Sequence, residues 1–434
     1  MTSCPSEELL HRLKSPGLDP DASARELSRE VDAAERSAGV QAAYNCVMRA
    51  QAALGLRKPS LAIYDHAFHM IGGAQKYGLT MAAAVRDLFH ITILSSKPVR
   101  LEDFQDWYGL DLSGCKLKVV RIPFFEEKSA FHLDPAFITR KMENPFHLVS
   151  LESGGYDLFV NNSMNEMVYP LSNISVLVCH FPERRRRSYF YADRYTYTIT
   201  NSLYTAGWVE ARWKYRPHLQ LHPPVDIEGA ETGQPKKKII LSVARFEPEG
   251  TKRQREMADA FLKLADDWPE VLGGWKLVLA GGSPPGNPYL AELERLAAGG
   301  PEGKVEVRVN IPLTELKSLY RESTLFWHLC GLTHDDPSEV EHFGMTTVEA
   351  MQSRLVPLVY DGGGLREIVD HGVNGFRVRS KAELLEFTIG LLRDPGLTTR
   401  LGEAAAEKAK MYTRARFEER VRTFFGGILK QYIL

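Results

Sequence analysis

The distribution of apolar and polar residues divides the chain into an N-terminal helical stretch and two series of short strands. Residues 1–55 are rich in Ala, Glu, Arg and Leu and lack the alternation of strands, which predicts helices. Beyond them, short apolar runs with β-branched residues alternate with helical or loop stretches. We expect the strands of the first series at 61–65, 91–96, 116–122, 157–162, 174–180 and 195–200.

A polar segment separates the two series. Residues 223–238 are rich in Pro, Gly and Lys, which is the composition of an interdomain linker. The second series of strands follows, and an amphipathic helical segment closes the chain. We expect the strands of this series at 239–245, 276–282, 304–309, 324–329 and 355–360. Strands interleaved with helices predict an α/β protein with two tandem Rossmann-like domains.

These patterns predict four parts. They are an N-terminal helical extension (1–55), a first Rossmann-like domain (56–226), a second Rossmann-like domain (238–405) and C-terminal helices (406–434) that pack back on the first domain. In sheets of this kind, ligands bind beyond the carboxyl ends of the strands. Paired domains also place their deepest cleft between them, where small-molecule sites concentrate.

The composition is that of an ordinary globular protein. Of 434 residues, 44% are apolar and 25% charged, and the formal net charge is -1. This balance provides no global attraction for nucleic acid, so an anion site must be local. Five scattered cysteines without a CxxC pair argue against a disulfide framework and a structural zinc site.

Two features of the sequence bear on its cellular location. The N-terminal stretch MTSCPSEELLHRLK lacks the apolar core of a signal peptide. No apolar run reaches the roughly 18 residues that a membrane helix needs. We therefore predict a cytoplasmic protein, with peripheral contact at the inner membrane face left open.

Two carboxylates, Glu341 and Glu349, are separated by seven residues in EHFGMTTVEAM. On one continuous helix they would lie about 12 Å apart along the axis, which is too far for both carboxylates to contact the same group of a ligand. A helix that begins just after Gly344 instead places Glu349 on its second turn and Glu341 in the preceding loop. Two acids at two depths suit an elongated ligand with hydroxyl groups at both ends. The alternative is a solvated pair flanking a helix start.

Three glycines, Gly362, Gly363 and Gly364, follow the last strand of the second series. Bare backbone amides at a strand-to-helix turn can form a nest for an anion, aided by the helix dipole. A plain turn would use the same residues. The triplet therefore supports an anion site without requiring one.

The second series opens with SVARFEPEGTKRQREMADAF, in which the strand ends at Arg245 and Lys252 opens a helix. A guanidinium and an ammonium at the carboxyl edge of this strand are well placed to bind a diphosphate. The alternative is that Lys252, Arg253 and Arg255 form a solvated helix face.

In the first series, Gly72 and Gly73 lie between a strand and a helix, and His180 ends the strand ISVLVCH. The glycines do not form the GxGxxG motif of dinucleotide sites, but a Gly-Gly turn lets the backbone approach a bulky substrate. A histidine at the carboxyl edge of a strand could form a hydrogen bond in the cleft. The alternative for His180 is a structural role.

Several segments together resemble the retaining glycosyltransferases of family 4, which have the GT-B fold. They are EHFGMTTVEAM, YDGGGLREIV, SVARF with TKRQ, LVLAGG and HGVNGF. HFP at 180–182 and EHFGMTTVEAM are most similar to the mannosyltransferases that extend dolichol-linked oligosaccharides and to bacterial relatives. The resemblance spans about residues 58–425 and does not extend to the first 55 residues.

The resemblance implies a role for each matching side chain. Glu349 would bind the ribose hydroxyls of the donor, and Glu341 would hold the hydroxyls of the transferred sugar. Arg245 and Lys252 would neutralise the diphosphate. His180 would contact the donor sugar.

The resemblance also implies backbone contacts with the donor. The backbone near Phe343 and Gly344 would assist Glu341, and the Gly363–Gly364 amides would bind donor oxygens. The Gly72–Gly73 turn would line the phosphate side.

The sequence departs from the family pattern at one point. The family usually has its lysine about five residues after the arginine, whereas Lys252 follows Arg245 by seven. Arg253 is the substitute if Lys252 does not occupy the site.

The implied activity is a retaining transfer of a hexose from a UDP- or GDP-linked sugar to a glycan, a lipid-linked glycan or a small molecule. Fixed positive groups would stabilise the departing diphosphate, so we expect no metal and no other cofactor. Glycosyltransferases of the other architecture hold a divalent ion with an Asp-x-Asp triplet. The triplet Asp19-Pro20-Asp21 lies outside both predicted sheets and so does not suggest such a metal site. Because no carboxylate is a convincing nucleophile, substitution on the same face of the sugar is favoured.

Two other functions remain open. A sugar-nucleotide epimerase shares the paired Rossmann-like architecture, although the two spaced glutamates argue against it. A catalytically silent subunit that binds nucleotide sugars is the second. Four arginines, Arg184–Arg187, lie among aromatic residues and could contact anionic lipid, with a solvated loop as the alternative.

Overall fold

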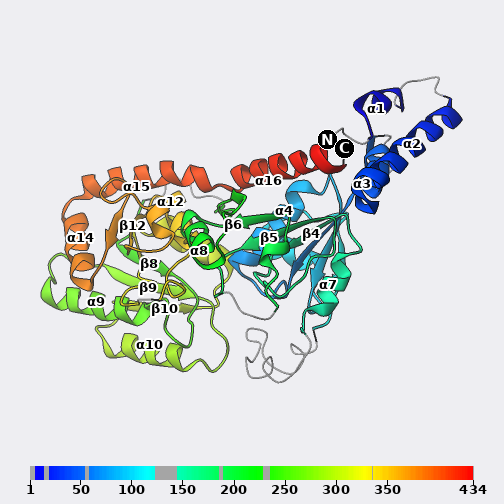
Figure 1. The fold of residues 1–434 in the computed structure, drawn as a ribbon. Coiled ribbons are helices and arrows are strands. Elements are labelled where there is room, and N and C mark those ends of the chain that lie inside the picture. Colours follow the sequence, from blue (N-terminus) through cyan, green and yellow to red (C-terminus); the bar gives the residue numbers. More distant parts are fainter. Residues whose placement is uncertain are drawn as a thin grey trace. The chain divides into compact units, whose positions relative to one another are not determined.

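The computed structural model describes residues 5–13, 19–53, 58–122, 144–184, 189–227, 235–334 and 336–433 (Figure 1). Contacts between Cα atoms group the chain into two compact units. The first unit comprises Met1–Ile199, Pro217–Leu219 and Phe417–Leu434. The second unit comprises Thr200–Arg216 and Gln220–Arg416.

The first unit is built around a seven-stranded sheet with the strand order β3-β2-β1-β4-β5-β6-β7. Its strands are β1 (Ser60–Asp65), β2 (His90–Ser95), β3 (Lys116–Val119), β4 (Leu158–Asn161), β5 (Ile174–Cys179), β6 (Tyr197–Thr200) and β7 (Leu219–Gln220). β1 pairs in parallel with β2 and β4. The central strands β4 and β5 are buried throughout. This explains their continuous apolar runs, because strands of a parallel sheet are covered on both faces.

Helices surround this sheet. They are α4 (Gly73–Val85), α5 (Leu101–Tyr108), α7 (His147–Ser153), the 3₁₀ helix η2 (Ala192–Arg194), α16 (Arg414–Ile428) and the π-helix η4 (Leu429–Ile433). The last long helix, α16, packs on α4 and the chain that follows it. The Phe417 ring lies 4.9 Å from the ring of Tyr77, and Arg422 donates to the carbonyl of Ala84 at 2.7 Å.

Among the described residues, the helices α1 (Glu7–Leu13), α2 (Pro20–Ala38) and α3 (Val40–Ala53) precede the first sheet. The side chain of Asp19 caps α2 by accepting from the amide of Asp21, and a proline follows as the first helical residue. α2 ends at Gly39, whose φ of 84° is left-handed. The helical character predicted for the N-terminal stretch is confirmed for the residues that the structure describes.

The second unit contains a six-stranded sheet with the order β10-β9-β8-β11-β12-β13. Its strands are β8 (Ile239–Val243), β9 (Lys276–Gly281), β10 (Val305–Val309), β11 (Leu325–His328), β12 (Val356–Tyr360) and β13 (Phe376–Val378), all paired in parallel. Its helices are α8 (Leu203–Trp213), α9 (Gln254–Asp267), α10 (Pro288–Gly299), α11 (Leu313–Glu322), α12 (Met345–Gln352), α13 (Leu365–Ile368), α14 (Lys381–Arg393), α15 (Pro395–Ala409) and the 3₁₀ helix η3 (Lys410–Tyr412).

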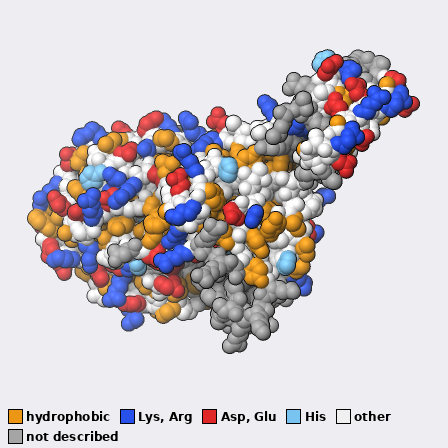
Figure 2. All heavy atoms as spheres, in the orientation of Figure 1, with side chains coloured by type: hydrophobic (Ala, Val, Ile, Leu, Met, Phe, Trp, Pro, Cys, Tyr) orange, Lys and Arg blue, Asp and Glu red, His pale blue; other side chains and the backbone are white. Residues whose placement is uncertain are grey.

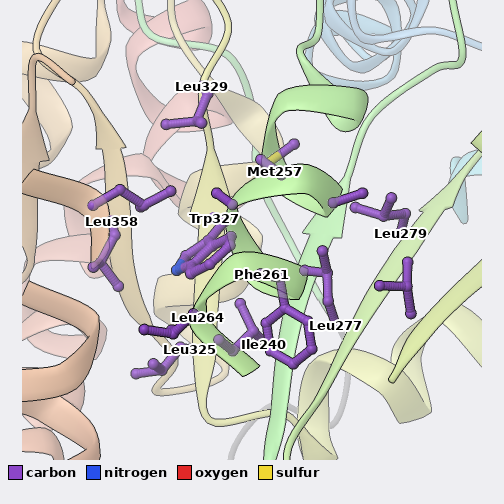
Figure 3. Close-up of a cluster of buried hydrophobic side chains, with 14 of the residues drawn as sticks. Ile240, Met257, Phe261, Leu264, Leu277, Leu279, Leu325, Trp327, Leu329 and Leu358 are labelled. Carbon is purple, nitrogen blue, oxygen red and sulfur yellow. The ribbon is translucent and has the colours of Figure 1, made fainter. Parts of the chain in front are cut away.

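The core of the second unit lies between its sheet and helices such as α9. Figure 3 shows Trp327 of β11 facing Phe261 of α9, with Ile240 of β8 beside them. The Trp327 and Phe261 rings are 6.3 Å apart and both are fully buried. Trp327 therefore occupies one face of the sheet and leaves the neighbouring positions of β11 to the other face.

Both sheets have the strand order of a Rossmann fold, in which the order reverses beside the first strand. The reversal lies between β1 and β4 in the first unit and between β8 and β11 in the second. The two predicted Rossmann-like sheets are confirmed. The sequence missed β7 and β13, which have two and three residues and are too short to show a period.

Charged side chains of both signs are mixed on the surface. In Figure 2, blue and red side chains alternate over the face of the second unit that carries α9 and α10. This agrees with the near-zero net charge of the sequence. Among the described residues, no helix combines the length and the apolar character needed to cross a membrane.

Candidate functional site

The charged residues predicted for the second unit lie after the two strands at its reversal point. Arg245 follows β8, and Lys252 lies between β8 and α9. Glu341 lies between β11 and α12. Open α/β sheets bind ligands outside the carboxyl ends of strands at this point, so the topology alone marks this edge as a candidate site.

Glu341 is held through one of its two oxygens. Lys252 Nζ donates to Glu341 Oε2 at 3.0 Å, and His328 Nε2 lies 3.0 Å from the same atom. The Glu341 side chain is 21% exposed and that of Lys252 19%. Among the described residues, no hydrogen bond is made by Glu341 Oε1. The carboxylate is therefore fixed on the protein side and open on the other.

The neighbours of this carboxylate determine its charge. Burial by itself would raise the pKa of Glu341, but Lys252 and His328 hold it well below its usual range. Burial opposes the charge of Lys252 too, yet Glu341 raises the pKa of the lysine above its usual value. Both groups are ionised at neutral pH. Because the carboxylate can only accept, His328 must carry its proton on Nε2.

His328, Cys330 and Glu341 are also the described residues whose side chains could hold a metal ion, since their ligand atoms lie within 4.8 Å of one another. The Lys252 ammonium already contacts two of them, at 3.0 Å from Glu341 Oε2 and 3.6 Å from Cys330 Sγ. Burial raises the pKa of the Cys330 thiol to about 12, which makes it a poor ligand at neutral pH. A metal ion would have to displace the lysine.

Lys252 contacts Glu341, whereas Arg253 has a different carboxylate partner. Arg253 precedes α9 with a left-handed φ of 59° and pairs with Glu256 at 3.0 Å. α9 begins at Gln254, so the prediction that Lys252 opens the helix is wrong by two residues.

Arg245 lies at the same edge of the sheet but is more exposed. Its guanidinium pairs with Glu247 Oε1 at 2.8 Å, and its side chain is 61% exposed. The hydroxyl of Thr251 donates to the other oxygen of Glu247. The loop after β8 therefore holds one exposed cation, Arg245, and one half-buried cation, Lys252.

Glu349 has the position that the sequence predicted. α12 begins at Met345, directly after Gly344, so Glu349 lies on its second turn. The hydroxyl of Tyr320 donates to Glu349 Oε2 at 2.8 Å. Burial and the neighbouring carboxylate raise the pKa of Tyr320 well above its usual value, so the hydroxyl keeps its proton. Neither Glu341 nor Glu349 projects into bulk water.

The three glycines after β12 allow two backbone segments to touch. A Cβ on Gly363 would lie 2.2 Å from the carbonyl oxygen of Glu341, and one on Gly364 would lie 2.2 Å from that of His342. The amide of Gly364 donates to the Glu341 carbonyl at 2.8 Å. The sequence had suggested that the Gly364 amide binds a donor oxygen. In the structure this amide is instead engaged within the protein. The prediction for the Gly363 amide stays a prediction.

The residues between the acids have structural partners. The Phe343 side chain is buried, 5.3 Å from the His222 ring and 5.5 Å from that of Tyr412. Gly344 has a left-handed φ of 108°, which favours glycine. Burial lowers the pKa of His342 to about 4, so this ring is neutral at physiological pH.

The predicted residues of the first unit lie at the carboxyl edge of its own sheet. Gly72 precedes α4, and Gly73 is its first residue. The amide of Gly72 donates to the hydroxyl of Tyr108 at 2.8 Å. His180 directly follows β5, and its ring lies 5.2 Å from that of Tyr77. Their contacts with a donor stay predictions.

Sequence reasoning did not assign a role to His328, Tyr320 or Cys330. His328 could have been noticed, because it is a polar residue that ends the apolar run TLFWH. Tyr320 looks like an ordinary core residue of an amphipathic helix, and nothing in the sequence links it to Glu349. Of the predicted run Arg184–Arg187, all but Arg184 lie outside the described residues.

A comparison with protein families finds a match within the second unit. Residues 226–408 match the family model of glycosyl transferases, group 1. The chain is thus similar to the group 1 glycosyl transferases over somewhat less than half of its length. The resemblance stated from the sequence is confirmed, and Arg245, Lys252, Glu341 and Glu349 all lie within the matched residues.

Curated proteins with similar sequences include several mannosyltransferases. The chain is 29% identical over 203 residues to the human GDP-Man:Man(3)GlcNAc(2)-PP-Dol alpha-1,2-mannosyltransferase, a match that covers 43% of this chain and 39% of that protein. It is 24% identical over 274 residues to the human alpha-1,3/1,6-mannosyltransferase ALG2, covering 54% of this chain and 62% of the relative. The chain thus spans about two fifths to three fifths of the length of these relatives.

Solved structures share the fold over most of the chain. Anabaena Alr3699/HepE, in complex with UDP and glucose, aligns with a TM-score of 0.63 and 17% identity over 85% of this chain and 99% of that one. The sucrose-phosphate synthase of Thermosynechococcus elongatus aligns with a TM-score of 0.60 and 15% identity over 86% of this chain and 100% of that one. The GT-B fold predicted from the sequence is confirmed.

Proposed function

We propose that this protein is a retaining glycosyltransferase that moves a sugar from a UDP- or GDP-linked donor to an acceptor hydroxyl. The observation that carries the proposal is the arrangement around Glu341. Lys252 and His328 hold one oxygen at 3.0 Å each, and Oε1 has no hydrogen bond within the described part of the chain. A carboxylate fixed in this way, at the reversal point of the sheet, is suited to accept from a sugar hydroxyl.

The roles proposed for the other residues follow from their charge and position. Glu349, held by the Tyr320 hydroxyl at 2.8 Å, would accept from the ribose hydroxyls. Lys252 and Arg245 would bind the diphosphate, because each supplies a cation at the carboxyl edge of β8. Lys252 would then be shared between Glu341 and the diphosphate.

The largest contribution to the rate would come from these fixed charges. The bond between the sugar C1 and the phosphate oxygen breaks as the acceptor oxygen bonds to C1, and the acceptor proton passes to the departing phosphate. Negative charge grows on the diphosphate, and preorganised cations stabilise it without rearranging. We propose substitution on the same face of the sugar, hence retention, and no requirement for a metal ion.

The acceptor we propose is a glycan or a lipid-linked glycan, since the name of the GDP-Man:Man(3)GlcNAc(2)-PP-Dol alpha-1,2-mannosyltransferase includes a glycan of that kind. The contribution of His180 and the Gly72–Gly73 turn to donor binding belongs to the same proposal. So does a peripheral contact with an anionic membrane surface through Arg184–Arg187. A small-molecule acceptor remains an alternative.

A donor panel tests the proposal. The protein is titrated with UDP, GDP, UDP-glucose and GDP-mannose while thermal unfolding is followed, because a ligand that binds only the folded state raises the Tm. The donor that stabilises it is then assayed for slow hydrolysis and for transfer, with and without EDTA. We expect one base to be preferred and hydrolysis to persist in EDTA.

The outcomes separate the alternatives. Stabilisation by a nucleotide sugar without hydrolysis or transfer would favour a silent binding subunit. An isomeric nucleotide sugar formed without an acceptor would favour an epimerase. No stabilisation by any of the four ligands would contradict the proposed function itself.

A further inference from the structure

Each of the two site carboxylates is held by a buried ring that reaches it from the core. His328 Nε2 lies 3.0 Å from Glu341 Oε2, and the Tyr320 hydroxyl donates to Glu349 Oε2 at 2.8 Å. His328 is 1% exposed and Tyr320 is fully buried. In both contacts a buried ring meets one oxygen of a carboxylate, although His328 belongs to β11 and Tyr320 to α11.

A third ring joins these two. Phe326 lies 6.4 Å from Tyr320 and 6.2 Å from His328 between ring centroids, with interplanar angles of 27° and 12°. Phe326 and His328 are two residues apart on β11, so their side chains share a face of the sheet. Both neighbours are thus nearly parallel to the Phe326 ring at distances typical of aromatic pairs.

The opposite face of the same strand is occupied by a different cluster. Trp327, between Phe326 and His328, packs on Phe261 of α9 in the core shown in Figure 3. β11 is therefore fixed from both sides. Phe326 and His328 therefore cannot shift independently of the sheet, and the buried Tyr320 of α11 packs against Phe326.

We propose that Tyr320, Phe326 and His328 form a ring column that positions Glu341 and Glu349 at a fixed separation for one nucleotide-sugar donor. This inference rests on the proposed function, since it assigns the two acids to the two ends of a donor. None of the three rings touches the donor in this scheme. They are positioning residues that act through the acids.

The reason for such a column lies in the loop between the acids. Glu341 lies outside any helix and Glu349 lies inside α12, with the left-handed Gly344 between them. The covalent path therefore does not fix their spacing. A column of buried rings restricts each carboxylate to one orientation before the donor arrives, which reduces the ordering cost of binding.

Two near-isosteric variants test the two ends separately. Tyr320→Phe removes only the hydroxyl, so we expect the Kd of UDP or GDP, whichever wild type binds, to rise by roughly 5- to 10-fold with kcat at saturating donor little changed. At the other end, His328→Leu should lower kcat by about 10-fold and change the nucleoside diphosphate Kd by less than about 3-fold. His328→Gln, which keeps an N–H donor, should recover most of the lost kcat.

A matched pair of phenylalanine variants tests the column as a unit. Phe326 and Phe261 are both fully buried in the second unit, but Phe326 belongs to the column and Phe261 packs on Trp327. Phe326→Leu and Phe261→Leu should lower the Tm by similar amounts. Only Phe326→Leu should raise the nucleoside diphosphate Kd and lower kcat together.

The column is overturned if Tyr320→Phe and His328→Leu leave Kd and kcat at wild-type values while wild type binds and turns over a donor. It is equally overturned if His328→Gln is as slow as His328→Leu, or if the two phenylalanine variants change binding equally. Should His328→Leu or a phenylalanine variant fail to fold, Tyr320→Phe and His328→Gln still decide. A wild-type protein that binds neither UDP nor GDP contradicts the proposed function rather than the column.

Discussion

The reversal points of the two sheets each contain a buried or half-buried carboxylate, and their surroundings are opposite in character. In the first unit, Asp65 ends β1 and accepts from the Ala67 amide at 2.8 Å, Asn162 Nδ2 at 2.7 Å and Gln75 Nε2 at 3.3 Å. These donors are neutral, and burial, opposed by the nearby His66, raises the pKa of Asp65. In the second unit the cation Lys252 helps to hold the pKa of Glu341 well below its usual range.

The difference indicates two different functions at the same topological position. Both oxygens of Asp65 have partners within the protein, and Asn162 also donates to the carbonyl of Ala74 in α4 at 2.8 Å. Asp65, at the end of β1, therefore links this strand to Asn162 and to α4. Glu341 keeps one oxygen without a partner among the described residues and is held by a cation that a diphosphate could share. We therefore assign ligand binding to the second arrangement.

The largest expected effect is on turnover in the second unit. Loss of one preorganised charge partner costs roughly 2.7–4 kcal/mol in the barrier, so Lys252→Ala should slow turnover by about 100-fold or more while the protein stays folded. Lys276→Ala is the control. Lys276 is the first residue of β9, at the opposite end of the strand from the site, and it forms a similar ion pair with Glu306 at 2.7 Å. Steady-state kinetics measure both variants, and unchanged turnover in Lys252→Ala would remove it from the site.

The next effect comes from the glycine loop that touches the Glu341 segment. A Cβ on Gly364 would lie 2.2 Å from the carbonyl of His342, so Gly364→Ala should destabilise the protein by about 1–3 kcal/mol and also lower turnover. Gly390 in α14 has nothing within 4 Å of its added Cβ, and Gly390→Ala should stabilise by about 0.5–1 kcal/mol. Urea unfolding compares the two, and equal effects would contradict the close approach.

A smaller effect should separate stability from binding in the first unit. Asp65→Asn places an amide nitrogen among donors, which should cost about 1–3 kcal/mol of unfolding free energy. The Kd of the preferred nucleoside diphosphate should change by less than about 2-fold, because we assign the nucleotide to the second unit. Thermal unfolding and titration measure the two quantities. A large rise in Kd at full folding would place Asp65 in the binding site.

The smallest effect is on the pH dependence of stability, and its sign should differ between the two carboxylates. The lowered pKa of Glu341 contributes stability above its unfolded value of about 4.5, and this stability is lost as pH falls. The raised pKa of Asp65 does the reverse: the native state is favoured below about 3.8 and loses stability as pH rises through the folded pKa.

Unfolding free energies at several pH values between 3 and 7 would test this contrast. The stability difference between wild type and Glu341→Gln should shrink as pH falls below about 4.5. The unfolding free energy of Asp65→Asn relative to that of wild type should increase as pH rises above about 3.8. Each slope is at most about 1.4 kcal/mol per pH unit, the limit for one proton. Slopes of the same sign would contradict the comparison.

The sequence alone predicted the two parallel sheets, because strands covered on both faces appear as continuous apolar runs separated by helices. It also predicted the start of α12 after Gly344, since a glycine before an apolar helix is a local signal. It placed Arg245, Lys252, Glu341 and Glu349 in one domain through their motifs. It did not reveal β7 or β13, whose two and three residues are too few to show a period.

Only the tertiary structure decided which groups meet. Lys252 and Glu341 are 89 residues apart and Tyr320 and Glu349 are 29 apart, and no local pattern links such pairs. The glycine triplet looked like an anion nest, yet the amide of Gly364 is used to hold the Glu341 backbone. Local periodicity specifies elements because it depends on neighbours in sequence, whereas a carboxylate's partners depend on how the finished elements pack.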